Sequence, residues 1–152
     1  MQPRLNYLQI APDTLKLATA LETHLAKSGL EQSLYHLVKT RASQINGCAY
    51  CIHMHTRDAR AHGETEERLY LLDAWRESPL YSDRERAALA WTEALTRISE
   101  THAPDDVYED VRRHFSEVEI VNLTMLIGMI NLWNRLAISM RSVHPVSKPK
   151  AA

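Results

Sequence analysis

The sequence predicts an all-α fold organised as a single domain. Its 152 residues suit one domain with a core of its own. Only four glycines and six prolines are present, too few for the many tight turns of an all-β chain. Apolar residues recur at spacings of three and four between short polar breaks, which is the period of an amphipathic helix. We therefore expect consecutive helices in one domain spanning residues 1–152.

Four helices are expected in the first half of the chain. The first covers residues 12–28, where leucine and alanine recur at helical spacing after a proline that suits the first helical turn. The second covers 31–46 and ends before Gly47, a residue typical of a helix C-cap. The third covers 48–61, and a short fourth helix covers about 64–74.

Two capping signatures mark the long helices of the second half. Ser82 is followed three residues later by Glu85, at the start of an alanine- and leucine-rich helix over 84–98. Ser116 and Glu119 repeat this spacing before the last long helix. Because that last helix is apolar on nearly every side, we expect it at the centre of the bundle or in a subunit interface.

The remaining C-terminal segments are a short helix and a tail. Pro104 opens the short helix, and Asp105 and Asp106 suit its positive N-terminal end. Helices are therefore expected over 104–142. Residues 145–152 are expected to form a loose tail.

The charge balance and the apolar segments exclude several classes of protein. The formal net charge is -1, so no basic field exists to attract nucleic acid or an anionic membrane surface. No segment reaches the roughly 18 uninterrupted apolar residues of a membrane span. The start MQPRLNYLQI lacks the basic region and apolar run of a secretory signal. We expect a cytoplasmic protein, with reduced thiols and with neither nucleic acid nor a membrane as partner.

The segment CAYCIHMH, residues 48–55, holds both cysteines of the chain and two of its histidines. On a helix, Cys48, Cys51 and His55 are separated by three and four residues and share one face. His53 projects to another side and is expected to be a surface residue. Three groups that can exchange protons and electrons are therefore predicted to lie together.

This arrangement favours a redox-active dithiol. Cys48 stands at the helix N-terminus, where free amides and the helix dipole favour a thiolate. His55 lies one turn after Cys51, where an imidazole can take a thiol proton. Two thiols one turn apart can also close a disulfide, so that one attacks an oxidant and the other resolves the product.

Three other interpretations of the same residues stay open. A zinc site would need His36 or His53 as a fourth ligand beside Cys48, Cys51 and His55, or an open position, and one helix cannot easily wrap three ligands around one ion. A structural disulfide would close a very short loop and constrain the unfolded chain little. The two cysteines could also be buried and inert.

The runs LVKTRASQINGCAYCIHMHTRDARAHGE and RLYLLDAWRESPLYSDRERAALAWTEALT carry a family resemblance. The chain resembles the alkylhydroperoxidase AhpD-like branch of the carboxymuconolactone decarboxylase family over about residues 12–100. The resemblance implies an AhpD-like helical bundle. It also implies a homo-oligomer, a trimer or a hexamer.

The resemblance also implies roles for individual residues. Cys51 would attack a peroxide, Cys48 would resolve the oxidised product, and His55 would exchange protons with Cys51; the helix dipole alone would instead favour Cys48 as the more acidic thiol. His36 stands twelve residues before Cys48, where the family usually has a glutamate. A histidine there can relay a proton but cannot hold a neighbouring imidazole as a cation by opposite charge. His53 likewise stands where the family often has an acidic residue.

The expected function is thiol-dependent reduction of alkyl hydroperoxides or hydrogen peroxide in antioxidant defence. No cofactor and no metal are required, because the two sulfurs carry the electrons. The resemblance implies that an external dithiol, lipoyl-bearing or thioredoxin-like, reduces the disulfide again. The alternatives are a carboxymuconolactone decarboxylase-type enzyme, whose chemistry needs no dithiol, a non-enzymatic redox-responsive oligomer, and a metal-binding helical protein.

Overall fold

The computed structural model describes residues 2–146, and every regular element within them is helical, as predicted. In chain order the elements are α1 (Tyr7–Ile10), α2 (Pro12–Leu25), α3 (Gln32–Asn46), α4 (Ala49–Ala61), α5 (Glu66–Leu71), the 3₁₀ helix η1 (Leu72–Ala74), α6 (Asp83–Thr96), α7 (Ile98–Thr101), α8 (Asp105–His114) and α9 (Glu117–Ser139). Of the tail expected over 145–152, residues 147–152 lie outside the described part.

The predicted helices are present with small changes at their ends. The expected helix over 64–74 is divided into α5 and η1. The four-residue helices α1 and α7 were not expected, because a single turn is too short to show a periodic pattern. Both capping boxes form as predicted: Ser82 with Glu85 begins α6, and Ser116 with Glu119 begins α9.

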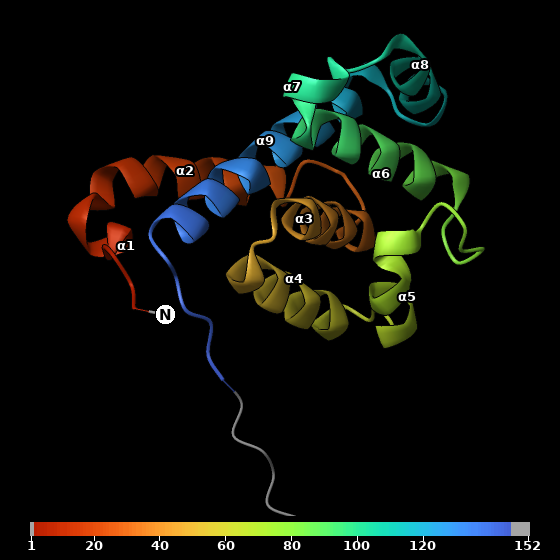
Figure 1. Ribbon diagram of the computed structural model, residues 1–152. Coiled ribbons are helices and arrows are strands. Elements are labelled where there is room, and N and C mark those ends of the chain that lie inside the picture. The colour runs from red at the N-terminus through yellow and green to blue at the C-terminus, as the bar shows by residue number, and fades with distance from the viewer. Residues whose placement is uncertain (1, 147–152) are drawn as a thin grey trace, which may run out of the picture.

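Helix α3 occupies the centre of the molecule, with α4, α6 and α9 packed around it (Figure 1). Its residues 34–43 are all buried. On one side its leucine, tyrosine and valine side chains join a core formed with α6, α8 and α9. On another side Leu37 joins Ala59 of α4 and the leucine and aromatic residues around α5.

The last helix, α9, was expected at the centre or in an interface, and it is only half covered. Ile120, Leu123 and Ile130 are buried against the rest of the bundle, whereas Val121 and Leu132 are exposed. The central helix is α3. Its buried part contains polar and charged residues, so its sequence does not look like that of a central helix.

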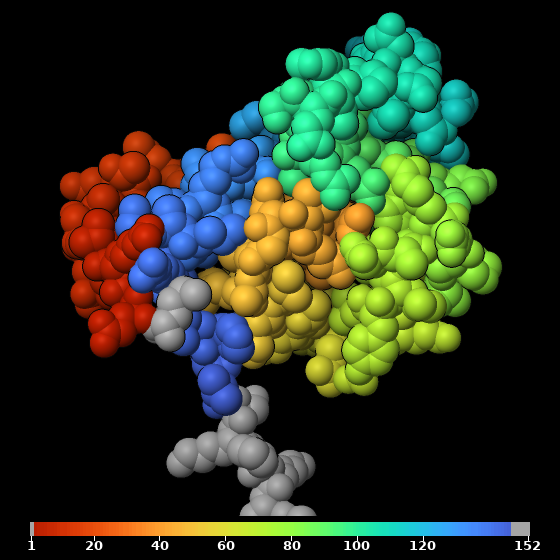
Figure 2. Space-filling model, viewed as in Figure 1, coloured from red at the N-terminus to blue at the C-terminus, as the bar shows by residue number. Residues whose placement is uncertain are grey.

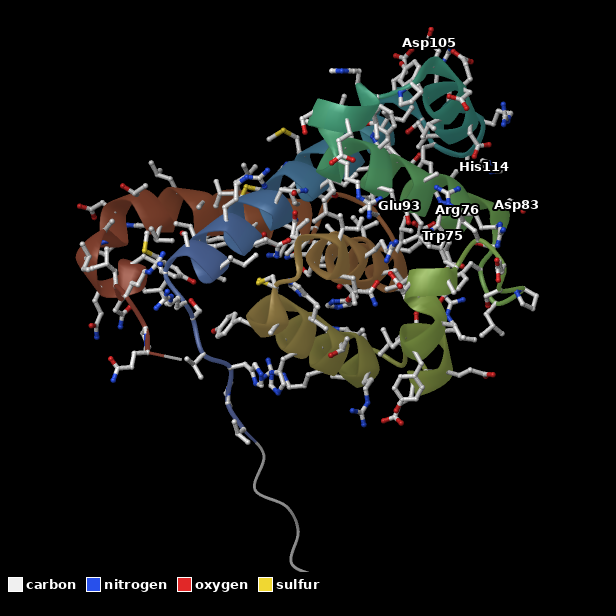
Figure 3. The ribbon with its side chains drawn as sticks, viewed as in Figure 1. Trp75, Arg76, Asp83, Glu93, Asp105 and His114 are labelled. Carbon is white, nitrogen blue, oxygen red and sulfur yellow. The ribbon has the colours of Figure 1, made fainter. Side chains whose placement is uncertain are left out.

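An ionic cluster fixes α3 against α6. Arg41 of α3 donates from Nε to Glu93 Oε1 of α6 at 2.9 Å and also pairs with Asp73 of η1. Trp75 Nε1 donates to Glu93 Oε1 at 2.8 Å, and Arg76 pairs with the other carboxylate oxygen at 2.9 Å (Figure 3). Because the buried guanidinium of Arg41 pairs with two carboxylates, the free-energy cost of burying its charge is offset, and α3 is held in place against α6 and η1.

Among the described helices, none combines the length and the apolar character needed to cross a membrane.

Candidate functional site

A tight junction between α3 and α4 positions the two cysteines. Gly47 ends α3 with a positive φ of 69°, a conformation that suits glycine. Cys48 follows as the N-cap of α4, and its N–H donates to the carbonyl of Ser43 at 2.9 Å. No side chain caps the start of α4, so its first amides remain free to interact with a thiolate.

Both cysteines are reduced and buried where three helices meet. Cys48 is 1% exposed and Cys51 is 2% exposed. They pack against Ala42 of α3 and against Ile130 and Ala137 of α9. Tyr50 and Trp133, both partly buried, complete this cluster. The thiols therefore face α9 as well as α3, although α9 begins more than 60 residues after them in the sequence.

Of the two buried thiols, Cys48 loses its proton more readily. The pKa of Cys48 is lowered to about 7 because the Cys51 thiol donates a hydrogen bond to it, assisted by backbone amides of α4 and by the side chain of Asn134, while burial opposes the shift. The pKa of Cys51 is raised by the same hydrogen bond, by burial and by the charge on Cys48. When the pair loses one proton, the negative charge is therefore on Cys48 and the remaining proton on Cys51.

His55 lies one turn after Cys51 and is 4% exposed. Neither of its ring nitrogens has a hydrogen-bond partner among residues 2–146. Burial first, then the positive charge of Lys39 and the proximity of His36, lowers its pKa to about 2. The sequence suggested a thiolate–imidazolium pair between Cys51 and His55. Burial disfavours this pair, and His55 is a neutral imidazole at physiological pH.

His36 lies on the buried part of α3 beside the second half of α4. Its ring centroid is 4.8 Å from that of His62 and 5.4 Å from that of Tyr35. Neither ring nitrogen of His36 has a partner in the described part of the chain. Burial and the neighbouring positive charges, His62 first, lower its pKa, and Asp58 opposes them. The structure thus places a second neutral imidazole close enough to His55 to influence its pKa.

His53 lies in a different environment from Cys48, Cys51 and His55 of the same segment. It is half-buried and stacks on His144, with ring centroids 4.7 Å apart and planes inclined by 16°. This contact joins α4 to the segment that follows α9. His53 is thus not an additional member of the buried thiol cluster, in agreement with its helical position.

Sequence reasoning missed a buried lysine beside the thiols. Lys39 of α3 is 4% exposed, lies 3.1 Å from Tyr35 Oη and pairs with the carboxylate of Glu22. The same carboxylate accepts hydrogen bonds from Tyr35 and from Trp133. The charge of Lys39 favours a thiolate on Cys51 and disfavours a cation on His55. The available signal in the sequence was a lysine directly after the apolar pair Leu37 and Val38 of the second expected helix.

A network of amides was also missed. Asn134 of α9 is 1% exposed; its Nδ2 donates to Ser43 Oγ at 3.0 Å, and its Oδ1 accepts from Asn46 Nδ2 at 2.8 Å. Asn46 also donates to Asn131 Oδ1 at 3.0 Å. Nothing local in the sequence joins these residues, because α3 and α9 meet only in the folded chain.

The sequence profile of the carboxymuconolactone decarboxylase family matches residues 12–94, which contain α2 to α5, most of α6 and the cysteine pair. The chain belongs to this family. Its helical bundle and its Cys48–Cys51 pair place it in the AhpD-like branch, as the resemblance implied.

Two similar proteins support the assignment to the family. The uncharacterized protein YdfG of Bacillus subtilis is 44% identical over 140 residues, which are 92% of this chain and 95% of that protein. A crystal structure from Agrobacterium tumefaciens, of a protein of unknown function for which an AhpD-type role in antioxidant defence has been suggested, is 49% identical. It superposes with a TM-score of 0.94 over 96% of this chain and 100% of the other.

A third protein of the same fold is more distant. The uncharacterized peroxidase-related protein from Silicibacter sp. TM1040 is 25% identical, with a TM-score of 0.76 over 86% of this chain and 69% of the other.

Within residues 2–146, no group of three or more histidine, cysteine or acidic side chains is arranged to hold a metal ion.

Proposed function

We propose that this family member is a thiol-dependent peroxidase that reduces alkyl hydroperoxides or hydrogen peroxide through a Cys48–Cys51 disulfide. The observation that carries the proposal is the buried pair of adjacent thiols, in which the pKa of Cys48 is lowered to about 7. A thiolate present at neutral pH, with a second sulfur adjacent, is what a dithiol peroxidase needs. The antioxidant role suggested for the Agrobacterium relative supports the same chemistry.

The first step forms a sulfenic acid on Cys51. The Cys51 proton passes along the existing hydrogen bond to Cys48, and the Cys51 thiolate attacks the terminal peroxide oxygen. Of the two thiolates, that of the higher-pKa Cys51 is the stronger nucleophile. The O–O bond breaks, and the leaving alkoxide takes the proton from Cys48, so that an alcohol is released.

The second step forms the disulfide. The Cys48 thiolate attacks the Cys51 sulfur, the S–S bond forms, and hydroxide leaves and becomes water by taking a proton from solvent. His55 and His36, both neutral, relay that proton by accepting it at one ring nitrogen and releasing one from the other. Two electrons have then passed from the sulfurs to the peroxide. The cycle requires neither a metal nor an organic cofactor, and an external lipoyl-bearing or thioredoxin-like dithiol restores the thiols.

The test is consumption of peroxide with dihydrolipoamide as reductant. Wild-type protein should reduce cumene hydroperoxide or hydrogen peroxide over many turnovers, and a single stoichiometric addition of peroxide should convert both thiols into one intramolecular disulfide, seen by mass spectrometry. A wild-type rate no greater than that of the Cys48→Ser/Cys51→Ser double variant would overturn the proposal.

His36→Glu should change the pH dependence of the peroxidase reaction. A carboxylate at this buried position would raise the pKa of His55 by opposite charge, and one nearby charge commonly shifts a pKa by about one unit or more. The measurement is the rate of cumene hydroperoxide reduction across the pH range in which the variant is folded. The comparison variant His36→Gln adds no charge, so it should slow the reaction by removing the relaying imidazole without producing the shift of the pH profile expected for His36→Glu. Superimposable profiles for His36→Glu and wild type would exclude His36 from the relay.

We also propose that α9 contacts a second copy of the chain in a homo-oligomer of three or six subunits. Val118, Val121, Met125 and Leu132 are exposed along α9, and Gly128 lies between them with open space beside its Cα. These positions alternate in steps of three and four, the pattern of a helix that packs against another helix. A groove of about 860 Å³ between α6, α7 and α9 runs along the same side. Figure 2 shows part of α9 uncovered between the α1–α2 region and the later helices.

Leu132→Glu should dissociate this oligomer. A carboxylate in an apolar helix contact loses its hydration without gaining a partner, so association becomes unfavourable. Multi-angle light scattering should give three or six subunits for the wild type and fewer for Leu132→Glu. Tyr70→Glu on α5, at a residue that is more exposed than Leu132 and does not line the groove, is the control and should keep the wild-type mass. A monomeric wild-type protein would overturn the proposal.

A further inference from the structure

The amide of Asn134 is directed at the two thiols by its place on α9. Asn134 lies four residues after Ile130 and three residues before Ala137, so the three side chains share one helical face. Ile130 and Ala137 both pack in the cluster that contains Cys48 and Cys51. The Asn134 side chain between them is almost completely buried. A polar group at this place needs polar partners on the same side, where the sulfurs are found.

The orientation of this amide is fixed at both ends of a hydrogen-bond chain. At one end, the Ile127 carbonyl can only accept, so Asn131 presents its NH₂ group there at 2.9 Å. Asn131 Oδ1 must then accept from Asn46, whose NH₂ group also reaches Asn134 Oδ1.

At the other end, the Ser43 hydroxyl donates to the carbonyl of Lys39 at 2.7 Å. Its oxygen must therefore accept from Asn134 Nδ2. The hydrogen bonds from Asn46 and to Ser43 therefore fix the same orientation of the Asn134 amide, with its NH₂ group towards α3 and the cysteines.

One hydrogen of that NH₂ group is used by Ser43, and the second is available to sulfur. A donor that faces a thiol stabilises the charged form, because a thiolate accepts a hydrogen bond more strongly than a thiol does. In agreement, the Asn134 side chain lowers the pKa of both Cys48 and Cys51. No histidine can supply this stabilisation, since His55 is neutral and buried.

We propose that Asn134 is a positioning residue that holds and stabilises the thiolate shared by Cys48 and Cys51, through an amide hydrogen whose direction is set by Asn46 and Ser43. The residue lies outside the 12–94 region matched by the family profile, so the redox pair depends on a helix beyond that region. The inference deepens the proposed peroxidase function and rests on it for its biological meaning, but thiolate stabilisation can be measured without any peroxide.

The experiment measures thiol ionisation in full-length protein carrying Asn134→Ala. The ultraviolet absorbance of the thiolate and the rate of alkylation by iodoacetamide are followed against pH. We expect the lower thiol pKa to rise by about one unit and the alkylation rate near neutral pH to fall roughly five- to tenfold, while the rate at high pH approaches that of the wild type. This recovery at high pH distinguishes lost thiolate stabilisation from a general loss of structure.

Two further variants keep the test decisive. Asn46→Ala leaves Asn134 in place but frees its amide to turn, and it should shift the thiol pKa in the same direction by a smaller amount. Asn122→Ala, on the same helix and bonded to the Ser28 carbonyl, is the matched control and should leave the pKa unchanged. A wild-type thiol pKa in folded Asn134→Ala, or in Asn46→Ala if the first variant does not fold, would overturn the inference. A raised pKa in a protein that reduces no peroxide would uphold it and overturn the proposed function instead.

Discussion

Cys51→Ser is expected to abolish peroxide reduction completely, whereas Cys48→Ser is expected to lose turnover but keep one oxidation event. Without Cys51 the attacking sulfur is missing, so the rate should fall to that of the free reductant, a loss of several orders of magnitude. Without Cys48, Cys51 can still form a sulfenic acid, which then has no sulfur with which to condense. Trapping of the sulfenic acid with a dimedone probe, followed by mass spectrometry, distinguishes the two variants.

The two outcomes test which cysteine attacks the peroxide and which one resolves the product, independently of whether the overall reaction occurs. The first oxidation in Cys48→Ser should also be slower than in the wild type, because the sulfur that receives the Cys51 proton is absent. Labelling of Cys48 by the probe in Cys51→Ser, at the rate of peroxide reaction in the wild type, would reverse the assignment of attacking and resolving sulfur. Such a reversal would leave the dithiol cycle intact.

Acidification is expected to destabilise the folded protein through His55. In the unfolded chain this histidine takes up a proton as the pH falls through about 6.5, while in the folded protein it stays neutral down to about 2. The unfolded state therefore binds more protons below pH 6.5, and stability is lost progressively as the pH falls from there. The loss amounts to about 1.4 kcal/mol for each pH unit below that value.

Urea unfolding at about pH 7.5 and about pH 5.5 measures this loss. His55→Asn should remove about 1.3 kcal/mol of the difference between the two conditions, since it deletes the titrating group. His24→Asn, at an exposed position of α2, serves as the control and should retain the full acid sensitivity. Equal acid sensitivity in His55→Asn and wild type would show that the imidazole is reached by solvent and protonated in the folded state.

Much of the fold follows from local signals in the sequence. The helix starts at Ser82 and Ser116 are encoded by side chains three residues apart, and Gly47 ends α3 because of its own conformational freedom. The shared face of Cys48, Cys51 and His55 is a property of one helix, so spacing alone reveals it. The structure also confirms the family and its AhpD-like branch.

Other features depend on contacts that no local pattern contains. Helix α3 carries Lys39 and Arg41 in its buried part, and it becomes central only because Glu22 and Glu93 from other helices neutralise them. The charge state of His55 depends on burial by neighbouring helices, which helical spacing cannot give. Asn134 is invisible from sequence for the same reason, since its partners on α3 are about 90 residues away.

The near-complete enclosure of both sulfurs restricts which reductants can regenerate them. Cys48 and Cys51 are 1% and 2% exposed, and Tyr50 and Trp133 pack against the cluster that contains them, so a thiol on a broad, rigid protein surface meets a large steric barrier. A dithiol at the end of a long, narrow and flexible arm meets a much smaller steric barrier. For the proposed cycle we therefore expect a lipoyl arm to regenerate the thiols faster than a thioredoxin-like domain does.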